Sequence, residues 1–173
     1  MLIKTDLPPR VKTRPHTIKF KKRPMKRNYV FLYKTEPEHY SDAYLAIRCV
    51  DNRFWKAFKS YIRSLGIKHI DPKSPAGGPK VLASPEKVGD RDYVLREIEK
   101  SIKLHRVKVV MLFSHHDCGA YGGFATFHNN EEEELTFHKT ELQKAKKVIL
   151  KKFPNLKVDT YFIDTRGIIK TSE

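Results

Sequence analysis

Short apolar runs alternate with longer segments of helical spacing from about residue 40 onward. The apolar runs predict β-strands at residues 44–47, 67–71, 107–113 and 158–163. The run VKVVMLF at 107–113 is almost wholly apolar, which is typical of a strand that is covered on both faces. Apolar residues at helical spacing predict helices over about 51–65, 85–105 and 131–152. Strands that alternate with helices indicate an α/β fold, in which a mostly parallel β-sheet is flanked by helices.

Turn and capping residues mark the ends of these elements. Asp51 or Asn52 is expected to cap the first helix, and Gly66 to end it. Residues 72–79 are dense in proline and glycine and predict a loop. The last long helix begins with four glutamates at 131–134, which complement the helix dipole and are expected to be solvated.

The charge of the chain is concentrated at its N-terminal end. The 173 residues suit one domain with an appendage and carry a net charge of +15. Residues 1–27 hold ten basic residues and one acidic residue, a net of +9, and four prolines interrupt them. We therefore expect a basic, proline-containing arm at 1–27 and an α/β domain at 28–173. The arm is interpreted as a solvated terminus, as a segment wrapped on a partner subunit, or less favourably as a nucleic-acid contact, because no recognised binding module surrounds it.

The sequence also bears on membranes and on the redox state of its cysteines. No apolar run approaches the roughly 20 residues that a membrane-spanning helix needs, so we expect no membrane span. The N-terminus carries charge but lacks the apolar core of a secretory signal. We therefore expect a cytoplasmic protein in which Cys49 and Cys118 are reduced thiols.

Both cysteines come directly after predicted buried strands. Cys49 opens the motif CVDNR, and Cys118 ends the motif HHDC. Ligands bind at the carboxyl ends of parallel strands. Two thiolates and one imidazole suit Zn²⁺, and three protein ligands leave the fourth tetrahedral position open, as catalytic zinc sites do. His115 and His116 compete as the imidazole, and the H-x-x-C spacing favours His115. The alternative is that the cysteines are only small core residues.

In this order and spacing the two motifs resemble those of the β-class carbonic anhydrases, which carry C-x-D-x-R after one strand and H-x-x-C-G after a later one. The resemblance covers roughly residues 43–169 and implies the fold of that family. It also implies that Cys49, His115 and Cys118 bind zinc. Ser114 departs from the family pattern, which has glycine before the histidine.

The resemblance gives roles to two further residues. Asp51 would accept a hydrogen bond from the zinc-bound water, and Arg53 would hold Asp51 in place. A two-pronged pair with Arg53 would keep Asp51 ionised, so that it could accept a proton from the water. On the residues alone, Asp51 and Arg53 could instead form a structural ion pair or a helix cap. In part of the family the same aspartate closes the zinc site in a resting form.

The expected function is the zinc-dependent reversible hydration of carbon dioxide to bicarbonate by a zinc-bound hydroxide, which makes the protein a carbonate dehydratase, a lyase. The resemblance implies at least a homodimer, because active sites in that family lie at subunit interfaces. One alternative is a hydrolase of a related small molecule, carbonyl sulfide or carbon disulfide. The other is a catalytically silent zinc protein whose basic arm binds a partner.

Four other positions near the motifs carry expectations. The Gly77-Gly78 turn is a candidate source of backbone donors near the metal. Asp117 is expected to be a turn or cap residue. His128 and His138 are expected to be solvated surface histidines, with proton shuttling as the alternative.

Overall fold

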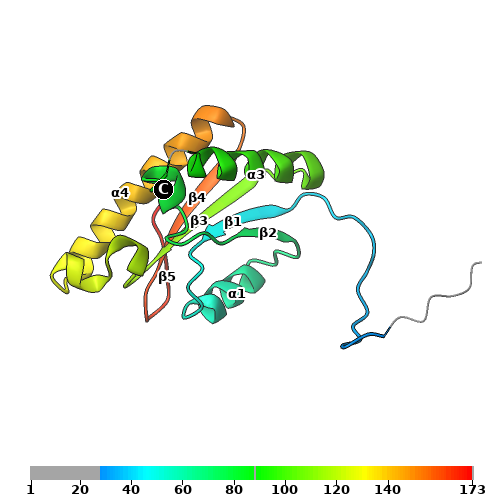
Figure 1. Ribbon diagram of the computed structural model, residues 1–173, viewed down its shortest axis with the longest axis horizontal. Helices are drawn as coiled ribbons and strands as arrows, with labels where there is room; N and C mark the ends of the chain where they lie inside the picture. The colour runs from blue at the N-terminus through cyan, green and yellow to red at the C-terminus, as the bar shows by residue number, and fades with distance from the viewer. Residues whose placement is uncertain (1–27, 88, 173) are drawn as a thin grey trace, which may run out of the picture. The chain divides into compact units, whose positions relative to one another are not determined.

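The computed structural model describes residues 28–87 and 89–172 (Figure 1). Contacts divide the chain into two units, Met1–Pro37 and Glu38–Glu173. The predicted basic arm at 1–27 lies outside the described residues. The arm and the domain boundary that follows it therefore stay predictions.

The second unit is built on a five-stranded sheet. Its strands are β1 (Tyr44–Arg48), β2 (Ile70–Lys73), β3 (Val109–His115), β4 (Lys157–Ile163) and β5 (Ile168–Lys170). Their spatial order is β2-β1-β3-β4-β5; the first four run parallel, and β5 runs antiparallel to β4. The predicted α/β class with a mostly parallel sheet is confirmed.

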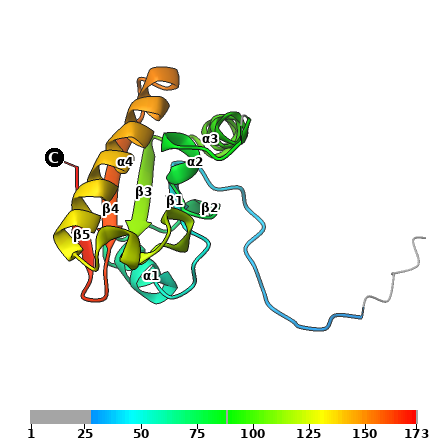
Figure 2. The same ribbon diagram turned by 60° about the vertical axis from the view of Figure 1, so that its left-hand side comes forward.

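Helices cover both faces of this sheet. The helices of the described residues are α1 (Trp55–Ser64), α2 (Lys80–Ala83), α3 (Asp90–His105) and α4 (Glu131–Lys152), with 3₁₀ turns η1 (Gly119–Tyr121) and η2 (Phe124–Phe127). Figures 1 and 2 show α3 and α4 on one face and α1 on the other. Among these helices, none is long and apolar enough to cross a membrane.

Neighbouring side chains of each central strand enter different cores. Leu45 and Ile47 of β1 pack in the larger core with residues of α3 and α4, whereas Ala46 packs in the smaller core with Phe58 and Ile62 of α1. Strands buried on both faces need apolar residues at successive positions, which explains the continuous apolar runs in the sequence. The two layers hold β1 and β3 rigidly, and these strands end at the candidate site.

Several element ends differ from the predictions. Helix α1 begins at Trp55 without a side-chain cap, because the Asp51 carboxylate is engaged by Arg53 instead. The predicted cap at 51–52 is therefore wrong. Gly66 follows the helix with a φ of +68°, the left-handed conformation expected of a glycine that ends a helix.

The segment before β3 also differs. Helix α3 begins only at Asp90, after Gly89. A separate short helix, α2, precedes it and buries Leu82 completely. One helical turn is too short to show a periodic pattern, which is why the sequence did not predict it. Strand β2 lies later than predicted, because the Ile67 N–H still bonds the Ile62 carbonyl at the end of α1.

Helix α4 has the predicted bounds but an unexpected buried face. Glu134, His138 and Glu141 are 1%, 0% and 3% exposed. The predicted solvation of the acidic turn is wrong for Glu134, and His138 is not a surface residue. Their spacing of four and three residues places all three on one side of the helix. A polar stripe therefore faces the interior of the domain.

Candidate metal centre

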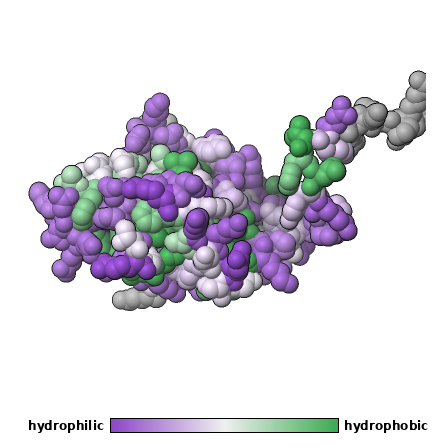
Figure 3. Space-filling view, turned by 90° about the horizontal axis from the view of Figure 1, so that it is seen from below, coloured by the Kyte–Doolittle hydropathy of each residue, from purple (hydrophilic) through white to green (hydrophobic). Residues whose placement is uncertain are grey.

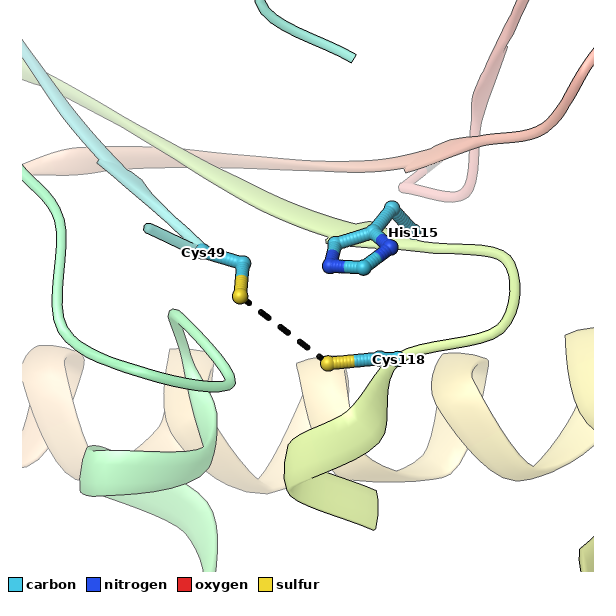
Figure 4. Close-up of side chains that lie close together, drawn as sticks. All are labelled: Cys49, His115 and Cys118. Atoms are coloured by element: carbon cyan, nitrogen blue, oxygen red, sulfur yellow. Dashed lines mark hydrogen bonds between the residues drawn. The ribbon is translucent and has the colours of Figure 1, made fainter. Parts of the chain in front are cut away.

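The candidate site lies at the carboxyl edge of the sheet, between β1 and β3. Cys49 directly follows β1, His115 is the last residue of β3, and Cys118 lies three residues further on (Figure 4). The two strands are parallel neighbours, with Arg48 beside Phe113. Their ends therefore bring together two motifs that are far apart in the sequence.

The three predicted ligand side chains converge. One atom each of Cys49, His115 and Cys118 lies within 4.8 Å of the others, and the two sulfurs are 4.0 Å apart. All three residues are buried. Two sulfurs and an imidazole nitrogen at this spacing form a group that could hold a metal ion.

The orientation of His115 leaves one nitrogen free. Its Nδ1 lies 2.8 Å from the carbonyl oxygen of His116 and is therefore occupied. Its Nε2 is buried and has no hydrogen-bond partner among the described residues. A buried polar atom without a partner is costly, so the free Nε2 fits a site that a metal completes. The ring of His116 is engaged elsewhere, since its Nδ1 lies 2.6 Å from a carboxylate oxygen of Glu134.

A glycine turn closes the site over Cys49. The Gly77 N–H donates to the Cys49 sulfur at 3.3 Å, so this turn does supply a backbone donor next to the cysteine. Gly78 has a φ of +56°, and a Cβ placed on it would lie 2.7 Å from the Cys49 nitrogen. The backbone of the turn thus approaches the end of β1 more closely than any side chain would allow.

The pKa values of the two thiols are shifted in opposite directions. The hydrogen bond from the Cys118 thiol lowers the pKa of Cys49, against the effect of burial, and His115 lowers it further. The same hydrogen bond raises the pKa of Cys118. One thiolate therefore forms readily beside the imidazole, whereas a second negative charge needs a nearby cation to offset it.

Asp51 and Arg53 form a clamp beside the cluster. Asp51 Oδ2 accepts from Nε and Nη2 of Arg53 at 2.9 and 2.7 Å, and Oδ1 accepts from the Arg53 backbone N–H at 2.8 Å. The hydrogen bonds from Arg53 lower the pKa of Asp51 to about 2. Arg53 also donates to the Asp117 side chain and to its carbonyl, each at 2.9 Å. One guanidinium thus joins the loops that follow β1 and β3.

Asp117 has a structural position, as expected of a turn residue. Its φ is +53°, and its Oδ1 accepts the Phe124 N–H at 2.9 Å. Left-handed backbone is unfavourable outside glycine, although aspartate tolerates it better than most residues. Side-chain bonds on both sides hold this turn between the two metal-ligand candidates.

A small cavity adjoins the cluster. It measures about 10 Å³, the space of about one water molecule. Asp51 and His115 line it together with the rings of Phe54, Phe58 and Phe113. A larger hollow of about 520 Å³ lies near α2 and α3, but none of the three clustered residues lines it. We assign the candidate site to the small cavity, because Cys49, His115 and Asp51 line it.

The sequence did not reveal two residues that support the site. Arg48 donates to the Cys49 carbonyl at 2.8 Å and stacks 4.5 Å from the Trp55 ring, while its Nε is buried without a partner among the described residues. Burial lowers the pKa of Arg48. Glu134 binds the loop between His115 and Cys118. Arg48 adjoins the first motif and could have been noticed, whereas Glu134 is linked to the second motif only by the fold.

Solved structures of the same fold are β-carbonic anhydrases. One is a tetrameric β-carbonic anhydrase of the ascomycete Sordaria macrospora, with a TM-score of 0.52 and 17% identity over 77% of this chain and 81% of that one. Another is β-carbonic anhydrase isoform I of Trichomonas vaginalis, with a TM-score of 0.52 and 12% identity over 82% of this chain and 87% of that one. At these identities the likeness concerns the fold.

Sequence comparison identifies the family. Two relatives named as uncharacterized proteins, from Rickettsia bellii and Rickettsia conorii, are each 30% identical over 129 residues, which is 73% of this chain and 79% and 69% of theirs. The model of the family described as "Putative carbonic anhydrase" matches residues 40–172, nearly all of the unit Glu38–Glu173. The chain therefore belongs to this family and is a small protein with the β-carbonic anhydrase fold.

Proposed function

We propose that the protein is a zinc-dependent carbonate dehydratase, a lyase that hydrates carbon dioxide reversibly to bicarbonate. One observation carries the proposal: Cys49 and His115 of a buried Cys-His-Cys group, whose imidazole has a free nitrogen, line the same small cavity as the ionised Asp51. Family and fold support the same reaction.

Cys49, His115 Nε2 and Cys118 would hold the zinc ion. Two soft sulfurs and one imidazole are a preferred donor set for Zn²⁺, and three protein ligands leave one coordination position for a reactant. Bound zinc supplies the acidification of a water molecule, which allows a hydroxide nucleophile to form near neutral pH. The divalent charge also suits a site where the second thiolate needs a cation.

Asp51 would accept a hydrogen bond from the attacking water and so orient it. Its low pKa keeps the carboxylate ionised throughout the physiological range. Oδ2 is taken up by the Arg53 guanidinium, whereas Oδ1 has a single donor, the Arg53 backbone N–H, among the described residues. A lone pair of Oδ1 thus stays available for a water proton. The geometry is fixed in advance, since Arg53 bonds both oxygens.

Aromatic rings make part of the cavity wall apolar. Phe54, Phe58 and Phe113 line the cavity together with the polar groups, and the Phe54 ring lies 4.9 Å from the His115 ring, tilted by 33°. Phe58 and Phe113 are buried, so this part of the cavity is apolar. Apolar rings at the site favour a small uncharged molecule such as carbon dioxide over a charged one, which would lose its hydration there.

Metal analysis combined with stopped-flow hydration of carbon dioxide tests the proposal. The purified chain is expected to contain one zinc per chain and to hydrate carbon dioxide. Cys49→Ser is expected to lose both properties, whereas Asp51→Asn is expected to keep zinc and lose about 10²- to 10⁴-fold in rate. Asp42→Asn is a matched control, because Asp42 is exposed before the amino end of β1 and pairs only with Lys108 and Ser41 among the described residues.

The remaining outcomes separate the alternatives. A zinc protein that fails to hydrate carbon dioxide but hydrolyses carbonyl sulfide or carbon disulfide would be a hydrolase built on the same centre. Zinc without either activity would leave the catalytically silent protein with a partner-binding arm. A chain without zinc would refute the metal centre itself.

We further propose that the protein forms a homo-oligomer and works in the cytoplasm. The Sordaria macrospora proteins of the same fold are tetrameric, which supports self-association. Residues 29–33 (YVFLY) expose five large apolar side chains in a row, each at least 62% exposed. Figure 3 shows hydrophobic side chains gathered on the segment next to the grey residues. Such a run is typical of an interaction segment. Two free thiols at the site suit a reducing compartment.

A further inference from the structure

We propose that Glu134 is a positioning residue that holds the imidazole of His115 in its metal-binding orientation. The connection runs through the peptide bond between His116 and Asp117. The inference rests on the proposed zinc centre but not on the identity of the reaction.

A single peptide unit links the carboxylate to the metal-ligand candidate. Its carbonyl oxygen, on His116, accepts from His115 Nδ1 at 2.8 Å. Its N–H, on Asp117, donates to Oε1 of Glu134 at 2.7 Å. A peptide unit is planar and rigid, so a carboxylate that fixes the N–H also fixes the direction of the C=O on the opposite side. The hydrogen bond to that carbonyl in turn sets the orientation of the His115 ring.

The carboxylate is itself firmly held. Its Oε2 lies 2.6 Å from Nδ1 of His116, and the residue is 1% exposed. Glu134 belongs to the first turn of α4, whose N-cap Asn130 accepts from two backbone N–H groups with its side chain. A long, capped helix therefore presents the carboxylate to the loop.

The arrangement has a chemical consequence for the metal ligand. A hydrogen bond from Nδ1 to the carbonyl fixes the tautomer in which Nε2 carries the free lone pair. The negative carboxylate at the other end of the peptide polarises it, which makes the carbonyl a stronger acceptor. Histidine ligands usually donate directly to a carboxylate or a backbone carbonyl. Here His115 donates to the His116 carbonyl, and Glu134 accepts from the N–H of the same peptide unit.

The loop needs this support because its own conformation is unfavourable. Asp117, between the two ligand candidates, has a φ of +53°. Arg53 holds the side chain and carbonyl of Asp117, and Glu134 holds its N–H. Removal of either contact would let the loop relax and turn Nε2 away from the sulfurs.

Zinc affinity of the full chain, measured by competition with a chromophoric chelator, tests the proposal. Glu134→Ala is expected to weaken zinc binding about 10- to 100-fold, the range for groups that orient metal ligands. Glu134→Gln keeps one oxygen for the Asp117 N–H but loses the charge, so a smaller loss is expected. Glu141→Gln is the matched control: Glu141 is buried on the same side of α4, but it accepts from Ser84, Lys144 and Tyr121 and not from the residues between His115 and Cys118. Its zinc affinity is expected to stay within about twofold of the wild-type value.

A second readout follows His115 without metal. In zinc-free protein labelled with ¹⁵N-histidine, at a pH high enough to keep the His115 imidazole neutral beside Cys49, wild type and Glu141→Gln are expected to show His115 as the Nδ1–H tautomer, and Glu134→Ala a mixture. Equal losses of zinc affinity in the Glu134 and Glu141 variants, or an unchanged tautomer in Glu134→Ala, would overturn the proposal. Wild-type protein that binds no zinc would refute the metal centre, while the tautomer measurement would still decide the role of Glu134.

Discussion

The buried His138 makes the stability of the fold depend on pH in a way that can be calculated. Its side chain is fully buried, and neither ring nitrogen has a hydrogen-bond partner among the described residues. The rings of Tyr121 and Phe162 lie 4.9 and 5.2 Å away, and those of Phe127 and Phe137 are also close. Burial lowers the pKa of His138 from 6.5 to about 4. The imidazole is therefore neutral at physiological pH.

The sign of the effect follows from proton binding in the two states. The unfolded chain takes up a proton on His138 as the pH falls below about 6.5, whereas the folded protein does so only near pH 4. Stability is therefore complete above pH 6.5 and is lost as the pH falls toward 4. A difference of about 2.5 pKa units corresponds to about 3 kcal/mol in total, and to about 2 kcal/mol at pH 5.

Urea unfolding of wild type and His138→Leu, at pH 7.5 and at pH 5, measures the contribution of His138 to the free energy of unfolding. Wild type is expected to lose about 2 kcal/mol more than His138→Leu between the two pH values. Other acid-sensitive groups, the metal ligands included, are common to both proteins and cancel in the comparison. At pH 7.5 the leucine variant is expected to be at least as stable, because it removes a buried polar ring without partners.

His128→Gln provides the control, since His128 is exposed and lies outside this cluster. It is expected to show the pH dependence of wild type. If His138→Leu and wild type lose the same stability between pH 7.5 and 5, the imidazole is protonated in the folded protein or is hydrated, and the reasoning fails.

Two further changes test the close approach at Cys49 and the role of the arm. Gly78→Ala is expected to lower the free energy of unfolding in urea by more than about 2 kcal/mol and to reduce the zinc content, because the new Cβ overlaps the backbone at Cys49 in addition to the cost of about 1–2 kcal/mol for a left-handed alanine. Gly66 has a similar φ and nothing within 4 Å, so Gly66→Ala measures the conformational cost alone. Equal losses of stability in the two variants would exclude the overlap. Deletion of residues 1–27 is expected to change the oligomeric state in light scattering more than the zinc content. An unchanged oligomer with lost, salt-sensitive DNA or RNA binding would instead assign the arm to nucleic acid.

The sequence predicted the parts of the site that are local to a strand end. Cys49, Asp51 and Arg53 occupy one turn after β1, and His115 and Cys118 occupy one loop after β3, so parallel strands were enough to bring them together. The predicted turn role of Asp117 and the backbone donor of Gly77 agree with the structure for the same reason.

The supporting residues could not be predicted because they depend on tertiary packing. Glu134 stands among four consecutive glutamates, and only the docking of α4 on the sheet separates it from its three exposed neighbours. Histidine is a residue type that is often found at the surface, yet His138 packs against aromatic rings from η1, η2 and β4. A polar residue on a helix shows its burial only when the opposite layer is known.

Arg53 shows why the two motifs have to be considered as one unit. It bonds Asp51 two residues away and Asp117 sixty-four residues away, with three hydrogen bonds to the first and two to the second. The same guanidinium therefore keeps the Asp51 carboxylate ionised and holds the loop that carries His115 and Cys118. A lysine has a single charged centre and cannot reproduce this fork. The proposed metal binding and the proposed role of Asp51 are thus linked through Arg53, and a change at Arg53 is expected to affect both, whereas a change at Asp51 or Glu134 is expected to affect mainly one.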